Sequence, residues 1–215
     1  MSKSPKPARS RISGGLLMFR RTNDEIEVLL AHPGGPFFVQ KDDGVWTIPK
    51  GEAAPGEDLL TRAQIEFEEE VGFRPENVQQ WIELGWIQQK GGKIVHAWAF
   101  EGNLPEPFQC KSNLFELEWP PRSGKYQKFP EVDRVCFFSD KAARTKLKSR
   151  QVPFLDRLRA ALAALCAAAH SLRRTLPCAA ADFLPTSPGG CGGIDRDDGL
   201  GYGSLRRLLY PCTDL

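Results

Sequence analysis

Residues 49–73 read PKGEAAPGEDLLTRAQIEFEEEVGF, and the last third of this stretch carries Glu66, Glu68, Glu69 and Glu70. Like charges at helical spacing repel each other by roughly 0.2–0.5 kcal/mol per pair, so a helix with no use for these carboxylates is less stable for having them. The stretch therefore predicts a cationic partner for its glutamates.

The residues 59–71 are predicted to form an amphipathic helix. At about 100° per residue, one side is apolar and fits a core-facing stripe, made of Leu60, Ala63, Phe67 and Val71. A second face carries three carboxylates with Arg62 among them, namely Glu66, Glu69 and Glu70. Oxygens at this spacing can share hard divalent cations such as Mg²⁺ or Mn²⁺, which often bridge to substrate phosphates. The competing interpretation is a solvated helix face without a ligand.

The context of the glutamates favours a site, because a turn-rich loop precedes the helix and Gly72 provides a C-terminal stop. The segment resembles the Nudix box, the loop–helix–loop signature G-x5-E-x7-R-E-U-x-E-E-x-G-U of the MutT-like Nudix hydrolases, where U is a bulky apolar residue. The positions that match are Gly51, Glu57, Glu66, Phe67, Glu69, Glu70, Gly72 and Phe73. The resemblance covers roughly residues 12–163, and it implies an α/β fold, the Nudix α/β/α sandwich with a mixed β-sheet.

The resemblance also implies an activity, the metal-dependent hydrolysis of a pyrophosphate bond in a nucleoside diphosphate-linked compound. Glu69 and Glu70 would bind Mg²⁺ or Mn²⁺, and the backbone carbonyl of Lys50 is a further expected ligand. Glu66 would be another ligand or the group that helps to deprotonate the attacking water, so the expected catalytic residues are Glu66, Glu69 and Glu70. Glu57 would support the cluster.

Members of this family often recruit one more carboxylate from a later loop. Glu131 is the candidate for this metal ligand, with Glu118 behind it. The alternative for Glu131 is an ordinary exposed loop acid.

Two segments bear on the substrate, expected to be a nucleotide or polyphosphate. The run 46–52, WTIPKGE, is similar to the W-x-x-P-K-G-x entry of Nudix hydrolases that act on dinucleoside polyphosphates, and there Lys50 would contact a phosphate. The run 119–133 is interpreted as a basic loop that could hold phosphates and stack a base, through Arg122, Lys125, Tyr126 and Lys128. An ordinary solvated loop is the alternative.

The box departs from the family pattern at one position, where Ile65 replaces the arginine thought to hold the glutamates in place. Isoleucine donates no side-chain hydrogen bond, and Arg62 is the nearest substitute, four residues before Glu66. Two hypotheses follow. One is a weakened enzyme that still binds metal, and the other is a catalytically impaired nucleotide- or RNA-binding module.

Strand patterns surround the box. Strands are expected at 13–21 and 26–35, in a hairpin at 81–89 and 93–102, and at 132–140, and one or two helices are expected within 139–165 with a cap at Ser139 or Asp140. Residues 1–11 are predicted to be a disordered basic arm, 12–163 the Nudix domain, and 164–215 a low-complexity, disordered tail. Nucleic-acid binding by the arm is the less favoured alternative.

The 215-residue chain as a whole has a net charge of +2, which gives no large field of either sign. Its six cysteines include no C-x-x-C pair, which favours a reduced, cytoplasmic setting. No apolar run approaches the roughly 18–20 residues needed to cross a bilayer, so no membrane partner is expected. The sequence does not indicate an oligomeric state.

Overall fold

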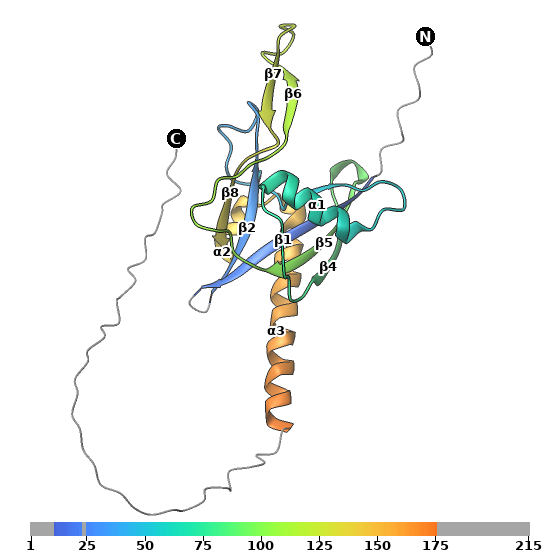
Figure 1. The fold of residues 1–215 in the computed structure, drawn as a ribbon, viewed down its shortest axis with the longest axis vertical. Coiled ribbons are helices and arrows are strands. Elements are labelled where there is room, and N and C mark those ends of the chain that lie inside the picture. Colours follow the sequence, from blue (N-terminus) through green and yellow to red (C-terminus); the bar gives the residue numbers. More distant parts are fainter. Residues whose placement is uncertain (1–10, 23–24, 176–215) are drawn as a thin grey trace, which may run out of the picture. The chain divides into compact units, whose positions relative to one another are not determined.

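The computed structural model describes residues 11–22 and 25–175, and for 169–175 it describes the backbone alone (Figure 1). The chain divides into two compact units, Met1–Cys166 and Ala167–Leu215. The first contains every strand of the described residues. Of the second, the described part is the continuation of one helix to Thr175.

The described residues form a six-stranded mixed sheet. Its strands are β1 (Ile12–Thr22), β2 (Glu25–Pro33), β3 (Lys50–Glu52), β4 (Ile82–Gln88), β5 (Ile94–Glu101) and β8 (Val132–Ser139). The order is β4-β5-β1-β2-β8, and β3 pairs with β1. The pairing of β1 with β5 is parallel and the other pairings are antiparallel. The expected strand pairs at the two hairpins are confirmed.

Helices cover both faces of this sheet, because β1 points successive side chains to opposite sides. Leu16 and Met18 pack with the apolar stripe of α1 (Leu59–Val71) in one core. Leu17 and Phe19 lie in the other core. That second core receives side chains from α2 (Asp140–Lys146) and α3 (Val152–Thr175), including Ala143, Phe154, Leu155 and Leu158. The predicted α/β/α sandwich with a mixed sheet is therefore confirmed.

The ends of the helices follow their capping residues. Asp58 accepts a hydrogen bond from the Thr61 N–H at 2.8 Å at the start of α1, and Gly72 ends it with φ of 81°. Ser139 caps α2 by accepting from the Ala142 N–H, as one of the two predicted caps. The helix expected at 59–71 therefore has the predicted bounds.

The run 119–133 is not the loop that the sequence predicts. It contains β7 (Tyr126–Pro130), which pairs with β6 (Leu114–Glu118) in a separate two-stranded sheet. The aromatic rings of Phe115 and Phe129 stand opposite each other across this hairpin, with centroids 6.1 Å apart. Such cross-strand pairs stabilise a hairpin. Residues 114–130 therefore form a projecting two-stranded ribbon in place of the predicted loop (Figure 1).

The predicted boundary between 163 and 164 falls inside α3, which continues to Thr175. Residues 176–215 of the predicted tail and 1–10 of the predicted arm lie outside the described residues. The disorder of both segments stays a prediction. Within 11–22 and 25–175, none of the helices has the length and apolar character that a bilayer crossing requires.

Phe67 tests the core under α1. It is fully buried, and its ring meets that of Phe100 edge-on at 5.5 Å. We expect Phe67→Ala to lower the free energy of unfolding by about 3–5 kcal/mol, through lost burial and the cavity left behind. Urea unfolding measures this. The control is Ile65→Ala two positions earlier, where the side chain is 38% exposed and the expected change is within about 0.5 kcal/mol. Equal effects of the two substitutions would contradict the assignment.

Candidate active site

The glutamates of α1 face the short strand β3. The Oε2 atom of Glu70 accepts a hydrogen bond from the Lys50 backbone N–H at 3.1 Å. Burial raises the pKa of Glu70 to about 7, and the negative charges of Glu66 and Glu131 add to this, while the charge and the N–H of Lys50 oppose it. The loss of hydration on burial therefore outweighs the stabilisation that Lys50 gives to the charged form of Glu70.

Glu66 lies directly against the backbone of Gly51. A Cβ atom at position 51 would stand 1.6 Å from the Cδ of Glu66, which is inside the carboxylate itself. A side chain there would displace the Glu66 carboxylate. The glycine of the box therefore allows Glu66 to lie against the strand backbone.

Glu131, at the connection from β7 to β8, is held beside the end of α1 by backbone hydrogen bonds. The Asn113 N–H donates to the carbonyl of Glu69 at 3.1 Å, and the Asn113 carbonyl accepts from the Glu131 N–H at 2.8 Å. Burial raises the pKa of Glu131, and the charges of Glu66 and Glu69 raise it further, against the effect of Lys50. The residue predicted from a later loop thus shares the electrostatic environment of the helix glutamates.

Arg62 contacts two of these glutamates. Its Nε donates to Oε1 of Glu66 at 2.8 Å, its Nη2 contacts the same oxygen, and Nη2 also lies 3.3 Å from Oε2 of Glu69. Ile65, at the position where the motif has arginine, is 38% exposed. The helix itself therefore supplies one positive charge to its glutamate face, and a divalent cation there stays a prediction.

Two other acidic side chains, Glu57 and Glu118, each accept a backbone hydrogen bond within a loop or turn. Glu57 accepts a hydrogen bond from the Ala54 N–H at 2.7 Å and so closes the loop before α1. Glu118 accepts from the Gly124 N–H at 2.8 Å and so closes the turn between β6 and β7. No interaction among the described residues joins Glu118 to the helix glutamates.

The predicted substrate-binding residues fall into two groups. Lys50 lies in the glutamate cluster, whereas the other four belong to the β6–β7 ribbon or its turn: Arg122, Lys125, Tyr126 and Lys128. Tyr126 is 69% exposed. Across the ranges 11–22 and 25–175, no hydrogen bond or ion pair connects these four residues with Glu66, Glu69, Glu70 or Glu131, and Lys128 pairs instead with Glu116 at 3.9 Å.

Sequence reasoning missed Lys148, in the connection between α2 and α3. Its backbone N–H donates to the Trp46 carbonyl at 2.9 Å, and burial lowers the pKa of its side chain, with the charge of Lys50 adding to this and that of Glu70 opposing it. The neighbouring Gln151 is buried and accepts from the Ile48 N–H at 3.0 Å. No local sequence signal could pair residues about 100 positions apart.

The donor set of the cluster fits a hard divalent cation, since carboxylate oxygens are the ligands such ions prefer. The raised pKa values of Glu70 and Glu131 mark repulsion that a cation would relieve. Among the described residues, however, no group of three or more His, Cys, Asp or Glu side chains is already arranged around one point. Binding would require the carboxylates to converge further.

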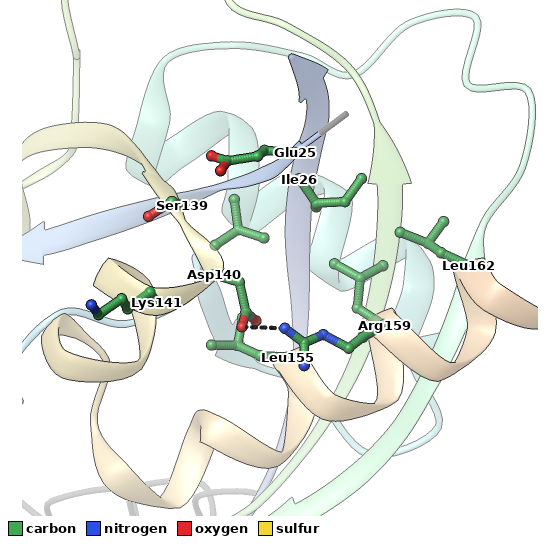
Figure 2. Close-up of a pocket in the computed structure, with 10 residues that line it drawn as sticks. Glu25, Ile26, Ser139, Asp140, Lys141, Leu155, Arg159 and Leu162 are labelled. Atoms are coloured by element: carbon green, nitrogen blue, oxygen red, sulfur yellow. Dashed lines mark hydrogen bonds and ion pairs between the residues drawn. The ribbon is translucent and has the colours of Figure 1, made fainter. Parts of the chain in front are cut away.

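A separate cavity of about 510 Å³ lies between the start of β2, the start of α2 and α3 (Figure 2). Its floor is apolar, and at its rim Arg159 pairs with Asp140 at 2.8 Å. None of the predicted site residues lines it. The cavity is therefore distinct from the glutamate cluster.

The chain resembles known proteins over the region just described. Residues 11–158 match the family model described as NUDIX domain. A rat protein, bis(5'-nucleosyl)-tetraphosphatase [asymmetrical], is 35% identical in a 102-residue alignment that covers 40% of this chain and 62% of that protein. The aligned part of the chain thus spans 62% of the length of that relative.

One solved structure supports this fold. The binary complex of a C. elegans Ap4A hydrolase matches with a TM-score of 0.51 and 22% identity, over 71% of this chain and 98% of that one. The NUDIX domain of Shewanella oneidensis NrtR, complexed with ADP ribose, has a TM-score of 0.46 and 15% identity, over 73% and 90%.

Glu70 makes stability depend on pH in the absence of divalent cations. Its folded pKa of about 7 exceeds the ordinary 4.5, so its contribution to stability is present below pH 4.5 and is lost as pH rises through 7. We expect Glu70→Gln, which keeps an acceptor for Lys50, to gain about 2 kcal/mol over the unmodified chain between pH 5.5 and 8.5. Urea unfolding at both pH values measures it.

The matched control is Glu68→Gln, which removes a half-exposed carboxylate from the same helix. This variant should track the unmodified chain at both pH values. An equal gain in the two variants would assign the effect to net charge and not to the burial of Glu70.

Proposed function

This chain belongs to the NUDIX domain family, and on that premise we propose that it is a divalent-metal-dependent pyrophosphohydrolase of dinucleoside polyphosphates or nucleotides. The observation that carries the proposal is that Glu66, Glu69, Glu70 and Glu131 share one electrostatic environment beside Lys50, in which burial and mutual repulsion raise the pKa of Glu70 and Glu131. The similarity to the rat tetraphosphatase supports the dinucleoside polyphosphate as substrate class.

The chemistry requires a mediator between two sets of negative charge, since carboxylates repel a polyphosphate. A bound Mg²⁺ or Mn²⁺ would neutralise phosphate charge and lower the pKa of its bound water. The residues proposed to hold it are Glu66, Glu69, Glu70, Glu131 and the backbone carbonyl of Lys50. Gly51 keeps Glu66 against the strand, and the Lys50 N–H orients one oxygen of Glu70.

Two further roles complete the proposed reaction, in which water attacks a phosphorus of the P–O–P bridge. Glu66 serves either as a ligand or as the acceptor of the proton from the attacking water, which is general-base catalysis. The ammonium group of Lys50 would contact a phosphate, and the side chain of Lys148, which interacts electrostatically with Lys50 and Glu70, would add a second positive charge. Both cations offset charge on the substrate.

The ribbon residues are proposed to bind the part of the substrate remote from the reacting phosphorus. Arg122 and Lys125 offer positive charge to phosphates, and the exposed Tyr126 offers a ring face to a base. Lys128 also forms an ion pair with Glu116, whose carboxylate lies 3.9 Å from the lysine Nζ. A cytoplasmic location remains a prediction.

A second candidate, a nucleotide-binding module without turnover, is favoured by one observation, the absence of an arginine at Ile65. The contacts of Arg62 argue against this candidate, because Arg62 lies one turn before Glu66 and binds both Glu66 and Glu69. The enzyme is therefore the preferred proposal.

Hydrolysis of diadenosine tetraphosphate by the full chain tests the proposal, with products separated by chromatography. We expect turnover with Mg²⁺ or Mn²⁺ and none with a chelator. Glu69→Gln should reduce kcat by more than the roughly 100-fold seen for groups that only support a metal ligand. Glu68→Gln, on another side of the helix, should retain activity.

The opposite result is nucleotide binding without turnover of diadenosine tetraphosphate, ADP-ribose or nucleoside triphosphates under any metal condition. That outcome would favour the binding module.

The ribbon has its own test, the double variant Arg122→Ala/Lys125→Ala. Loss of contacts made equally in the ground and transition states raises KM without changing kcat, so we expect KM for diadenosine tetraphosphate to rise several-fold at constant kcat. Lys90→Ala, in the turn between β4 and β5, is the control. An unchanged KM in the double variant would remove the ribbon from the substrate site.

A further inference from the structure

We propose that Arg62 is a positioning residue that holds Glu66 and Glu69 in the arrangement the metal site requires, in place of the arginine that the motif puts at position 65. The inference rests on the proposed function, because it assigns these glutamates to a metal site. It adds a residue that lies outside the motif.

The contacts of Arg62 have the form of a bridge between two carboxylates. Its Nε and Nη2 both reach Oε1 of Glu66, and Nη2 also reaches Oε2 of Glu69 at 3.3 Å. Glu66 and Glu69 lie about one helical turn apart, so a single rigid group fixes the spacing between them. A planar guanidinium with several donors can do this, whereas an ammonium group offers a point charge.

The bridge leaves ligand atoms available. It uses one oxygen of Glu66 and one of Glu69, and no other hydrogen bond within the described ranges reaches either carboxylate. The second oxygen of each glutamate can therefore bind a cation while Arg62 stays in place. This distribution suits a positioning group and not a group that blocks the site.

Burial strengthens the bridge. The side chains of Arg62 and Glu66 are 24% and 12% exposed, so their charge-assisted bonds are shielded from water more than a surface ion pair is. Glu66 is also confined on its other side by Gly51. Without Arg62, the repulsion among Glu66, Glu69 and Glu131 would have no nearby counter-charge on the helix.

Helix geometry explains how positions 62 and 65 can be exchanged. At about 100° per residue, Arg62 lies between Glu66 and Glu69 in angle, roughly 40° from one and 20° from the other. Position 65 precedes Glu69 by four residues and is about 40° from it, so an arginine there would face Glu69 and return the positive charge to the same side of the helix. Ile65 is 38% exposed and leaves room for it.

The experiment uses the full chain and two readouts, Mn²⁺ binding by calorimetry without substrate and hydrolysis of diadenosine tetraphosphate. Arg62→Ala should weaken Mn²⁺ binding by about 10- to 100-fold and lower kcat more than it raises KM. Arg62→Lys should recover only part of this loss. Arg62→Ala/Ile65→Arg should restore Mn²⁺ binding to within a few fold, which a merely structural defect would not allow.

The control is Arg74→Ala, which removes an exposed arginine that lies 3.9 Å from Glu68 and should change neither readout. Unchanged or tighter Mn²⁺ binding by Arg62→Ala would overturn the inference. The same holds if the double variant fails to recover Mn²⁺ binding, or if the unmodified chain binds no Mn²⁺. An unmodified chain that binds Mn²⁺ but hydrolyses nothing would overturn the proposed function alone. The Mn²⁺ affinities of the variants relative to the unmodified chain would still test the role of Arg62.

Discussion

The close approach of α1 to the sheet is the constraint on which the site depends. Two glycines allow it. A Cβ atom at Gly14 in β1 would lie 2.2 Å from the carbonyl oxygen of Leu59, and one at Gly51 in β3 would lie inside the Glu66 carboxylate. Since β1 and β3 are hydrogen-bonded neighbours, the same pair of strands lies under the start and the middle of the helix. Glu66 therefore lies on bare backbone, with no side chain between it and the strand.

This closeness sets the electrostatics. A carboxylate pressed against backbone loses water, and the N–H of Lys50 replaces only part of that hydration at Glu70. Arg62 supplies counter-charge on the solvent side of the cluster, and Lys50 and Lys148 supply it on the strand side. The site thus combines several carboxylates with three nearby cationic side chains, Arg62, Lys50 and Lys148.

How much of this could be predicted follows from the range of the interactions involved. The bounds of α1 and its caps depend on neighbours within four residues, so the spacing of Asp58, the apolar stripe and Gly72 was enough to place them. The strand pairs at both hairpins likewise follow from adjacent runs. Arg62 could be named because a helix makes residues four apart neighbours.

The failures involve long-range or weak signals. The β6–β7 ribbon has two five-residue strands separated by a proline-rich turn, too little alternation to stand out from a loop. Lys148 and Gln151 reach the site only through tertiary folding. Glu118 carries the same chemistry as Glu131, and only the fold shows that its carboxylate caps a turn.

The backbone of Asn113 has a consequence for how this site can vary. It joins the end of α1 to Glu131 by two main-chain hydrogen bonds, and the Lys111 N–H adds a third bond, to the carbonyl of Val71. Main-chain bonds do not depend on side-chain identity, so these three bonds tolerate substitution at Lys111 and Asn113. Ser112 differs, because its Oγ accepts a hydrogen bond from the Val132 N–H at 3.0 Å. A single inserted or deleted residue would shift the register of this link. The distance of Glu131 from the helix glutamates is therefore set by the length of a three-residue main-chain link, far from Glu131 in the sequence.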